Sequence, residues 1–105
     1  MPKMNSHAFL RKYLNAYSPV AQETEGQRIW LNYIANYVHM IDSDAYGTAW
    51  GIYKSDNPNA KRVVIEAHCD EIAWIITHIE KDGFVRLKRH GGSDNMIAPS
   101  KTVLI

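Results

Sequence analysis

The chain has 105 residues and a mass of 12.0 kDa, with 46% hydrophobic and 22% charged residues, a composition that excludes disordered, collagenous and disulfide-rich proteins. Its formal net charge of +1 supplies little of the positive field on which nonspecific nucleic-acid binding depends, so we expect no nucleic-acid partner. A chain of this length can form one modest core, because it buries only about 60–70% of its unfolded surface.

Two helices are predicted in the first forty residues. Ser6 is a candidate N-cap for a helix over roughly 6–16, which Ser18-Pro19 would stop. Thr24 is the candidate cap of a second helix in "TEGQRIWLNYIANYVH". Its apolar residues form one stripe at helical spacing: Ile29, Trp30, Tyr33, Ile34, Tyr37 and Val38. Such a stripe is typical of core packing, and we assign it no ligand.

The hydrophobic period changes at residue 40. Residues 40–68 contain short β-leaning runs and turn signals, which predict two strands joined by turns, with "VVIEA" as a buried strand. "EIAWIITHIE", "KDG" and "FVRLKR" predict a hairpin with Asp82-Gly83 at its turn. "KTVLI" at 101–105 predicts the start of another strand. We therefore expect an α/β chain with two helices, a mixed sheet and then only strands.

The last predicted strand ends at Ile105 on an apolar residue, without a turn or polar tail. Domains seldom stop within a strand, because a terminal strand needs a partner and usually closes with polar residues. We expect the 105 residues to be a piece of a longer polypeptide.

The cysteine content and the apolar runs bear on the cellular setting. Cys69 is the only cysteine, so no disulfide can form within the chain, whereas small secreted domains usually carry several. A cytoplasmic location is the expectation. The N-terminus lacks the apolar region of a signal peptide, and no run approaches the ~18 apolar residues of a membrane span. We expect no membrane partner.

The stretch "RVVIEAHCDE" brings a histidine and two acids to the end of an apolar run. Side chains alternate along a strand, so His68 and Asp70 should project to one face and Cys69 to the other. An imidazole is a good ligand for zinc or cobalt, and a nearby carboxylate can take the other ring N–H and fix the tautomer. Glu71 adds a third polar group.

A purely structural reading of this histidine stays open, because a histidine at a strand end is often simply hydrogen-bonded. One histidine also cannot hold a catalytic zinc, which normally takes three protein ligands and water. The other histidines, at positions 7, 39, 78 and 90, have no spacing that fits a metal site. The sequence therefore contains at most part of such a site.

The segment "VVIEAHCDEIAWIITHIEKDGFVRLKRHGGSDNMIAPSKTVLI" closely resembles the tetrahedral, dinuclear-metal aminopeptidases, a family of glutamyl and deblocking aminopeptidases also labelled endoglucanases. The His-Cys-Asp-Glu-Ile and Gly-Gly-Ser-Asp blocks are its most specific parts. The paired N-terminal helices, "SPVAQETEGQ" and "DAYGTAWGIY" keep the family's order, so the resemblance extends over essentially the whole chain.

The resemblance implies that the complete protein hydrolyses N-terminal residues of peptides with a water activated by two divalent metal ions, zinc, cobalt or manganese. His68 would be a metal ligand and Asp70 the catalytic carboxylate that orients it, whereas Glu71 would be structural. The bridging Asp, the general-base Glu and the other ligands have no counterpart in these 105 residues. We therefore expect the metals to be incomplete or absent here, and the chain alone to be inactive.

The resemblance also implies two partial domains. Residues 1–70 would be the N-terminal part of a zinc-peptidase-like α/β catalytic domain, and residues 71–105 the beginning of a β-barrel-like dimerisation insert. The complete protein would then be a homo-oligomer that acts on peptide substrates.

Two other functions stay open. Exposed strand edges and apolar residues such as Val103, Leu104 and Ile105 would suit a noncatalytic module that associates with copies of itself or with the missing part. The basic residues Arg86, Lys88 and Arg89, with His90, could form an anion or nucleic-acid patch, although such residues usually form a solvated face.

Overall fold

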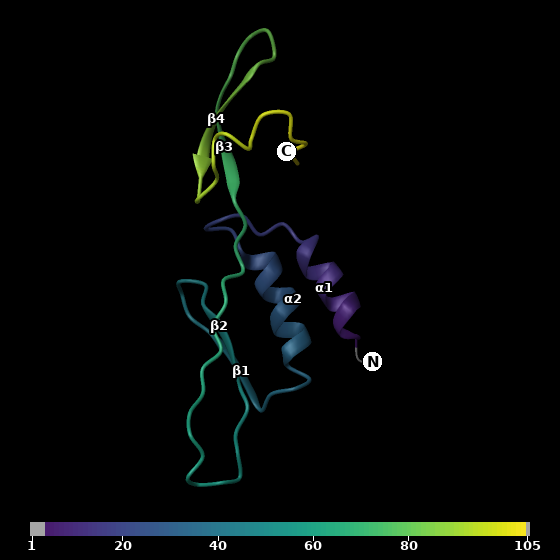
Figure 1. Ribbon diagram of the computed structural model, residues 1–105, viewed down its shortest axis with the longest axis vertical. Helices are drawn as coiled ribbons and strands as arrows, with labels where there is room; N and C mark the ends of the chain where they lie inside the picture. Colours follow the sequence, from purple (N-terminus) through teal and green to yellow (C-terminus); the bar gives the residue numbers. More distant parts are fainter. Residues whose placement is uncertain (1–3, 105) are drawn as a thin grey trace.

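The computed structural model describes residues 4–104 as two helices followed by two separate β-hairpins (Figure 1). The elements are α1 (Ser6–Leu14), α2 (Thr24–Ile34), β1 (Met40–Ser43), β2 (Ala49–Ile52), β3 (Ala73–Ile79) and β4 (Val85–His90). β1 pairs with β2 and β3 with β4, both antiparallel. The chain thus combines helices with small antiparallel sheets.

Both predicted helices are present, with corrected ends. α1 is capped by Asn5, whose Oδ1 accepts a hydrogen bond from the Ala8 N–H at 2.8 Å, and not by Ser6. It ends at Leu14, before residue 16. α2 has Glu23 at its N-cap position in place of Thr24 and ends at Ile34. In the part of the chain that is described, no helix is both long enough and apolar enough to cross a membrane.

Of the predicted stripe, Tyr33 packs against α1, while Ile34 and Val38 lie beside Gly51 of β2. The rings of Phe9 on α1 and Tyr33 on α2 are stacked with their centroids 4.0 Å apart. The ring of Tyr33 also lies beside the ring of Tyr37, with the two centroids 5.1 Å apart. The helix pair is therefore joined mainly by aromatic contacts.

Both hairpins follow their turn signals. Between β1 and β2 the Asp44 carboxylate accepts hydrogen bonds from the N–H groups of Tyr46 and Thr48, each at 2.9 Å. Between β3 and β4, Gly83 has a φ of +92°, which glycine adopts readily, and the predicted Asp82-Gly83 turn is confirmed. The β3–β4 hairpin extends away from the helices along the long axis of the molecule (Figure 1).

The predicted "VVIEA" strand is absent, and so is the predicted mixed sheet. Residues 63–67 pair with no strand among residues 4–104, and Val63, Val64 and Ile65 are 80%, 86% and 95% exposed. A strand forms only where a neighbouring strand takes up its backbone hydrogen bonds, and the described chain places none beside this run.

The same reason applies near the C-terminus. Residues 101–104 form no strand, with Val103 54% and Leu104 86% exposed, while Ile105 lies outside the described residues. The predicted strand at 101–105 is therefore wrong for residues 101–104. The parallel pairing outside the hairpins consists of one bridge, between Pro19 and Glu71.

The expected modest core is not formed. The radius of gyration is 18.5 Å, whereas a compact domain of 100 residues has about 13 Å. Two-stranded sheets that stand apart cannot cover each other's faces, so their apolar side chains stay largely exposed. The buried residues of 4–104 are small: Ala16, Ser18, Pro19, Gly26 and Ser93. Apart from the last, they gather where the loop after α1 meets the start of α2.

Candidate functional site

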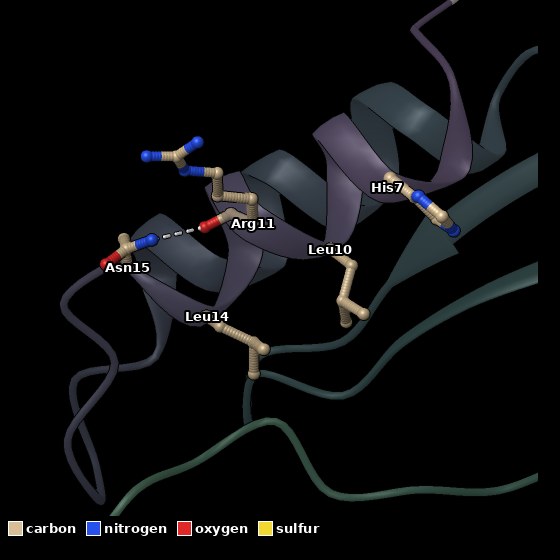
Figure 2. A pocket seen from close by; sticks show the side chains of 5 residues that line it. All are labelled: His7, Leu10, Arg11, Leu14 and Asn15. Carbon is tan, nitrogen blue, oxygen red and sulfur yellow. Dashed lines mark hydrogen bonds between the residues drawn. The ribbon is translucent and has the colours of Figure 1, made fainter.

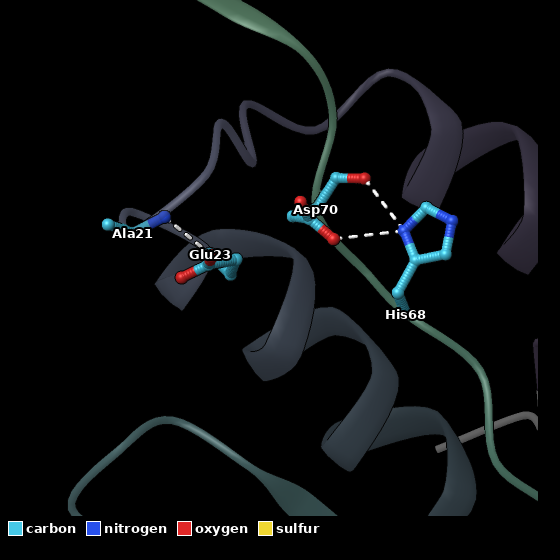
Figure 3. Close-up of polar contacts among 4 residues, drawn as sticks. All are labelled: Ala21, Glu23, His68 and Asp70. Atoms are coloured by element: carbon cyan, nitrogen blue, oxygen red, sulfur yellow. Dashed lines mark hydrogen bonds and ion pairs between the residues drawn. The ribbon is translucent and has the colours of Figure 1, made fainter. Parts of the chain in front are cut away.

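His68 and Asp70 face each other at the end of the unpaired run, as the alternation of side chains predicts (Figure 3). The His68 Nδ1 lies 2.9 Å from Asp70 Oδ1 and 3.1 Å from the Asp70 carbonyl oxygen. Both oxygens are acceptors, so Nδ1 must carry the hydrogen and donate it. In the neutral ring, Nε2 is then left with its lone pair, which is the form of imidazole that binds a metal.

The pair is open to solvent. The His68 side chain is 85% exposed and the Asp70 side chain 34% exposed. Within residues 4–104, Nε2 of His68 has no hydrogen-bond partner. An exposed pair of this kind contributes only about 0–1 kcal/mol to stability, so its effect is to orient the ring.

Cys69, between the two, contacts the helices. Its thiol lies against the hydroxyl group of Tyr13 on α1 and near the carboxylate of Glu23. Burial raises the pKa of Cys69, the negative charges of Glu23 and Asp70 raise it further, and the hydrogen bond with Tyr13 acts weakly in the opposite direction. A thiol held neutral is a poor nucleophile and a poor metal ligand, so Cys69 is not assigned a chemical role.

Glu71 joins the end of this segment to the loop before α2. Its N–H donates to the Ser18 carbonyl oxygen at 2.9 Å, and its own carbonyl oxygen accepts from the Val20 N–H at 3.2 Å. Its carboxylate accepts a third bond, from the Ser18 N–H at 3.1 Å. These contacts are structural in kind and agree with the structural role expected for Glu71.

The loop that receives Glu71 is itself held on two further sides. The Ser18 Oγ accepts the Gly26 N–H at 3.0 Å, which ties the loop to the first turn of α2. The His90 Nε2, at the end of β4, lies 3.0 Å from the Val20 carbonyl oxygen and donates to it. The sequence pattern marks Ser18 only as the end of the first helix, and neither Ser18 nor Gly26 signals this contact by itself.

The described residues do not complete a metal centre. No group of three or more His, Cys, Asp and Glu side chains within 4–104 is placed to hold an ion. The carboxylate of Glu23, also drawn in Figure 3, accepts the Ala21 N–H at 2.6 Å. Among the described residues, His68 presents an exposed ring nitrogen, and Asp70 accepts the hydrogen bond from the other ring nitrogen.

The remaining histidines lie elsewhere. His7 lines an open depression on α1 with Leu10, Arg11, Leu14 and Asn15, a surface without His68 or Asp70 (Figure 2). His39 accepts the Lys54 N–H through Nδ1 at 2.9 Å, and His78 lies 3.5 Å from Glu80.

The basic residues of β4 are mostly engaged within the protein. Arg86 forms an ion pair with Glu80, and Arg89 donates to the Ser93 carbonyl oxygen at 2.7 Å. His90 is bound to the loop at Val20. Lys88 alone of the proposed patch has no such contact among the described residues, and of the three basic side chains only Arg86 is paired with a carboxylate.

The chain belongs to the M42 glutamyl aminopeptidase family, a family of peptidases, whose family model matches residues 47–105. This match includes His68 and Asp70 and is shorter than the whole-chain resemblance seen in the sequence. A relative from Escherichia coli (strain K12), named "Putative aminopeptidase SgcX", is 43% identical over 49 residues, which are 47% of this chain and 13% of that protein. The chain thus spans only a small part of the length of this relative.

Proposed function

We propose that this chain is the N-terminal part of a metal-dependent aminopeptidase, that it supplies the metal ligand His68, and that Asp70 is the carboxylate that orients this ligand. The observation that carries the proposal is the bond from His68 Nδ1 to Asp70 Oδ1, which leaves Nε2 exposed and able to bind a cation. Family membership supports the reaction class.

The complete enzyme would hold two divalent ions, of zinc, cobalt or manganese, which when bound generate the attacking hydroxide and polarise the scissile carbonyl. His68 is the one ligand that the described residues offer, so the other ligands and the general base must come from the remainder of the protein. Asp70 keeps the hydrogen on Nδ1 and raises the basicity of Nε2. The 105 residues alone would be inactive.

The same proposal divides the chain near residue 70. Residues 1–70 would belong to the α/β catalytic domain and residues 71–105 would begin a β-barrel-like dimerisation insert. The direction of the β3–β4 hairpin, which leaves the helices immediately after Glu71, supports this division (Figure 1). The homo-oligomer would then assemble through the insert.

Metal content and peptide hydrolysis of the full-length protein test the assignment. His68→Ala should remove one tightly bound ion and most of the activity, and Asp70→Asn should lower metal affinity or activity by about 10–100-fold. His7→Ala, which changes a histidine on α1, is the matched control and should alter neither. A His68→Ala enzyme with its metals and activity intact would contradict the proposal.

We propose as a second candidate a noncatalytic interaction module that takes up strands from the remainder of an M42 polypeptide. The exposure of Val63, Val64 and Ile65 favours it. A continuous apolar run is typical of a strand whose two faces are both covered by other parts of a protein. Pairing with the edge of one hairpin would leave both faces of this run uncovered.

Sedimentation of the 105-residue chain, alone and mixed with a polypeptide that carries the remainder, tests this candidate. We expect a complex that Val64→Lys weakens at least tenfold, whereas Lys61→Ala, outside the apolar run, leaves it intact. Self-association without the added polypeptide would instead favour a second copy as the partner. A monomer that binds nothing would reject the module.

A further inference from the structure

We propose that Glu71 is a positioning residue, which holds the His68–Asp70 pair in place by fixing the next residue of the chain to the loop at Ser18. The consequence for catalysis rests on the proposed function. The positioning itself depends only on contacts within the described chain.

The pair is supported at Cys69, whose thiol contacts the Tyr13 hydroxyl group, and on its C-terminal side, at Glu71. Before His68, residues 62–66 are exposed and pair with no strand in residues 4–104, so they cannot fix where the imidazole lies. After Asp70, the first residue with long-range hydrogen bonds is Glu71. The pair therefore projects from an anchored end of the segment, and the other end is unsupported.

The anchor consists of three hydrogen bonds on one residue. Two are the backbone bonds of the parallel bridge, to the Ser18 carbonyl oxygen at 2.9 Å and from the Val20 N–H at 3.2 Å. The third is charge-assisted, from the Ser18 N–H to the Glu71 carboxylate at 3.1 Å. Together the backbone and side-chain hydrogen bonds fix the position and the orientation of residue 71. They thereby set the direction in which residues 68–70 extend.

The receiving loop is the most enclosed part of the described chain. Ser18 is 5% exposed, and Pro19 and Gly26 beside it are buried. A Cβ on Gly26 would lie 2.3 Å from Ser18 Oγ, which shows how closely the loop and α2 approach. His90 adds a hold from β4. An anchor on this loop is therefore connected to both helices and to the second hairpin.

One oxygen of the Glu71 carboxylate, Oε1, accepts the Ser18 N–H, and the carboxylate has no hydrogen bond to His68 among the described residues. Its action on the candidate ligand therefore passes through the backbone. Glu66, two residues before His68, is an exposed carboxylate without a contact in residues 4–104 and serves as the matched control.

The tautomer of His68 is the readout, measured by long-range proton–nitrogen NMR of the 105-residue chain at one alkaline pH at which imidazoles are neutral. In the wild type we expect the Nδ1–H form. Glu71→Ala should convert its signal to an average of the two tautomers, because the pair loses its fixed geometry. Glu71→Gln should retain the Nδ1–H form, since a carboxamide oxygen can accept the same bond from Ser18, and Glu66→Ala should leave it unchanged.

Hydrogen exchange of the Ala35 N–H, which donates to the Leu31 carbonyl oxygen at 3.0 Å at the far end of α2, is measured on the same samples and establishes that α2 is still folded in each variant. The proposal is overturned if Glu71→Ala leaves the wild-type tautomer with α2 folded, if Glu66→Ala has an equal effect, or if Glu71→Gln is as damaging as Glu71→Ala. Failure of the metal assignment would appear in the full-length metal analysis and would leave the tautomer result untouched.

Discussion

Two neighbouring regions of this chain behave in opposite ways. The junction of Ser18, Gly26 and Glu71 consists of small or polar groups that are hydrogen-bonded and partly buried. Residues 63–65, only six positions before Glu71, are strongly apolar and almost fully exposed. The polar junction is packed, whereas the apolar run is neither paired nor buried. This reverses the usual relation between hydrophobicity and burial.

The difference shows which interactions need a complete sheet. Hydrogen bonds at the junction are satisfied between groups that the described chain contains, so they form with the partners at hand. Burial of the apolar run needs strands on its edges and layers on its faces, and nothing in residues 4–104 supplies them. Placement of the candidate ligand thus depends on the junction.

The largest effect expected at the junction comes from Gly26→Ala. Alanine gains about 1 kcal/mol over glycine inside a helix. The new methyl group would lie 2.3 Å from Ser18 Oγ and displace it, which strands a buried N–H at a cost of about 1–3 kcal/mol and adds overpacking of about 1–3 kcal/mol. We expect a net loss of about 1–5 kcal/mol in the free energy of unfolding, measured by urea titration of helical circular dichroism.

The control for this substitution is Gly92→Ala, because a Cβ there meets no atom within 4 Å. It should leave stability nearly unchanged. An increase in stability for Gly26→Ala, as helix propensity alone predicts, would mean that the close approach to Ser18 is incorrect.

A smaller effect of opposite sign is expected at Ala21. This residue has a φ of +66° in the turn closed by the Gln22 N–H and the Pro19 carbonyl oxygen at 2.8 Å. Left-handed backbone costs a residue with a Cβ about 1–2 kcal/mol, whereas glycine costs about 0.4–1 kcal/mol in the entropy of the unfolded chain. Ala21→Gly should therefore stabilise the chain by about 0.5 kcal/mol, seen as a higher urea midpoint.

Ala60→Gly is the matched control, because Ala60 lies in a loop without a positive φ. There the entropic cost acts alone and the midpoint should fall slightly. Equal shifts at both positions would rule out strain in the turn at Ala21.

The smallest effect concerns Cys69, at the border of the two regions. Burial raises the pKa of its thiol in the folded chain, and Glu23 and Asp70 add to the increase. A raised folded-state pKa contributes stability that is complete below the pKa of the unfolded thiol and is lost as pH rises through the folded value. Alkylation at about pH 8.5 should therefore be slower in the native chain than in urea.

Glu23→Gln should speed alkylation of the native chain, since it removes a negative charge near the thiol, and it should not alter the rate in urea. A native rate equal to or above the rate in urea would contradict the enclosure of Cys69 against Tyr13.

The sequence predicted what local rules control. Both helices and the β3–β4 hairpin follow from periodicity and turn residues, and β1 and β2 were expected only as strands joined by a turn. The His68–Asp70 contact follows from alternation along an extended chain. The prediction of a strand at residues 63–67 was wrong, because a strand needs a neighbouring strand to pair with and the apolar pattern does not show whether one is present. The contact of Ser18 with Gly26 was missed because it depends on how a loop returns over a helix, which neither residue type reveals alone.

The unpaired run bears on the tendency of the polypeptide to aggregate. Lys61, Arg62 and Glu66 bracket Val63, Val64 and Ile65, so the bare apolar stretch stays below the ~5–7 residues that promote aggregation. Charges at both ends act as gatekeepers, which lowers the tendency of this exposed stretch to associate with the same stretch of other chains.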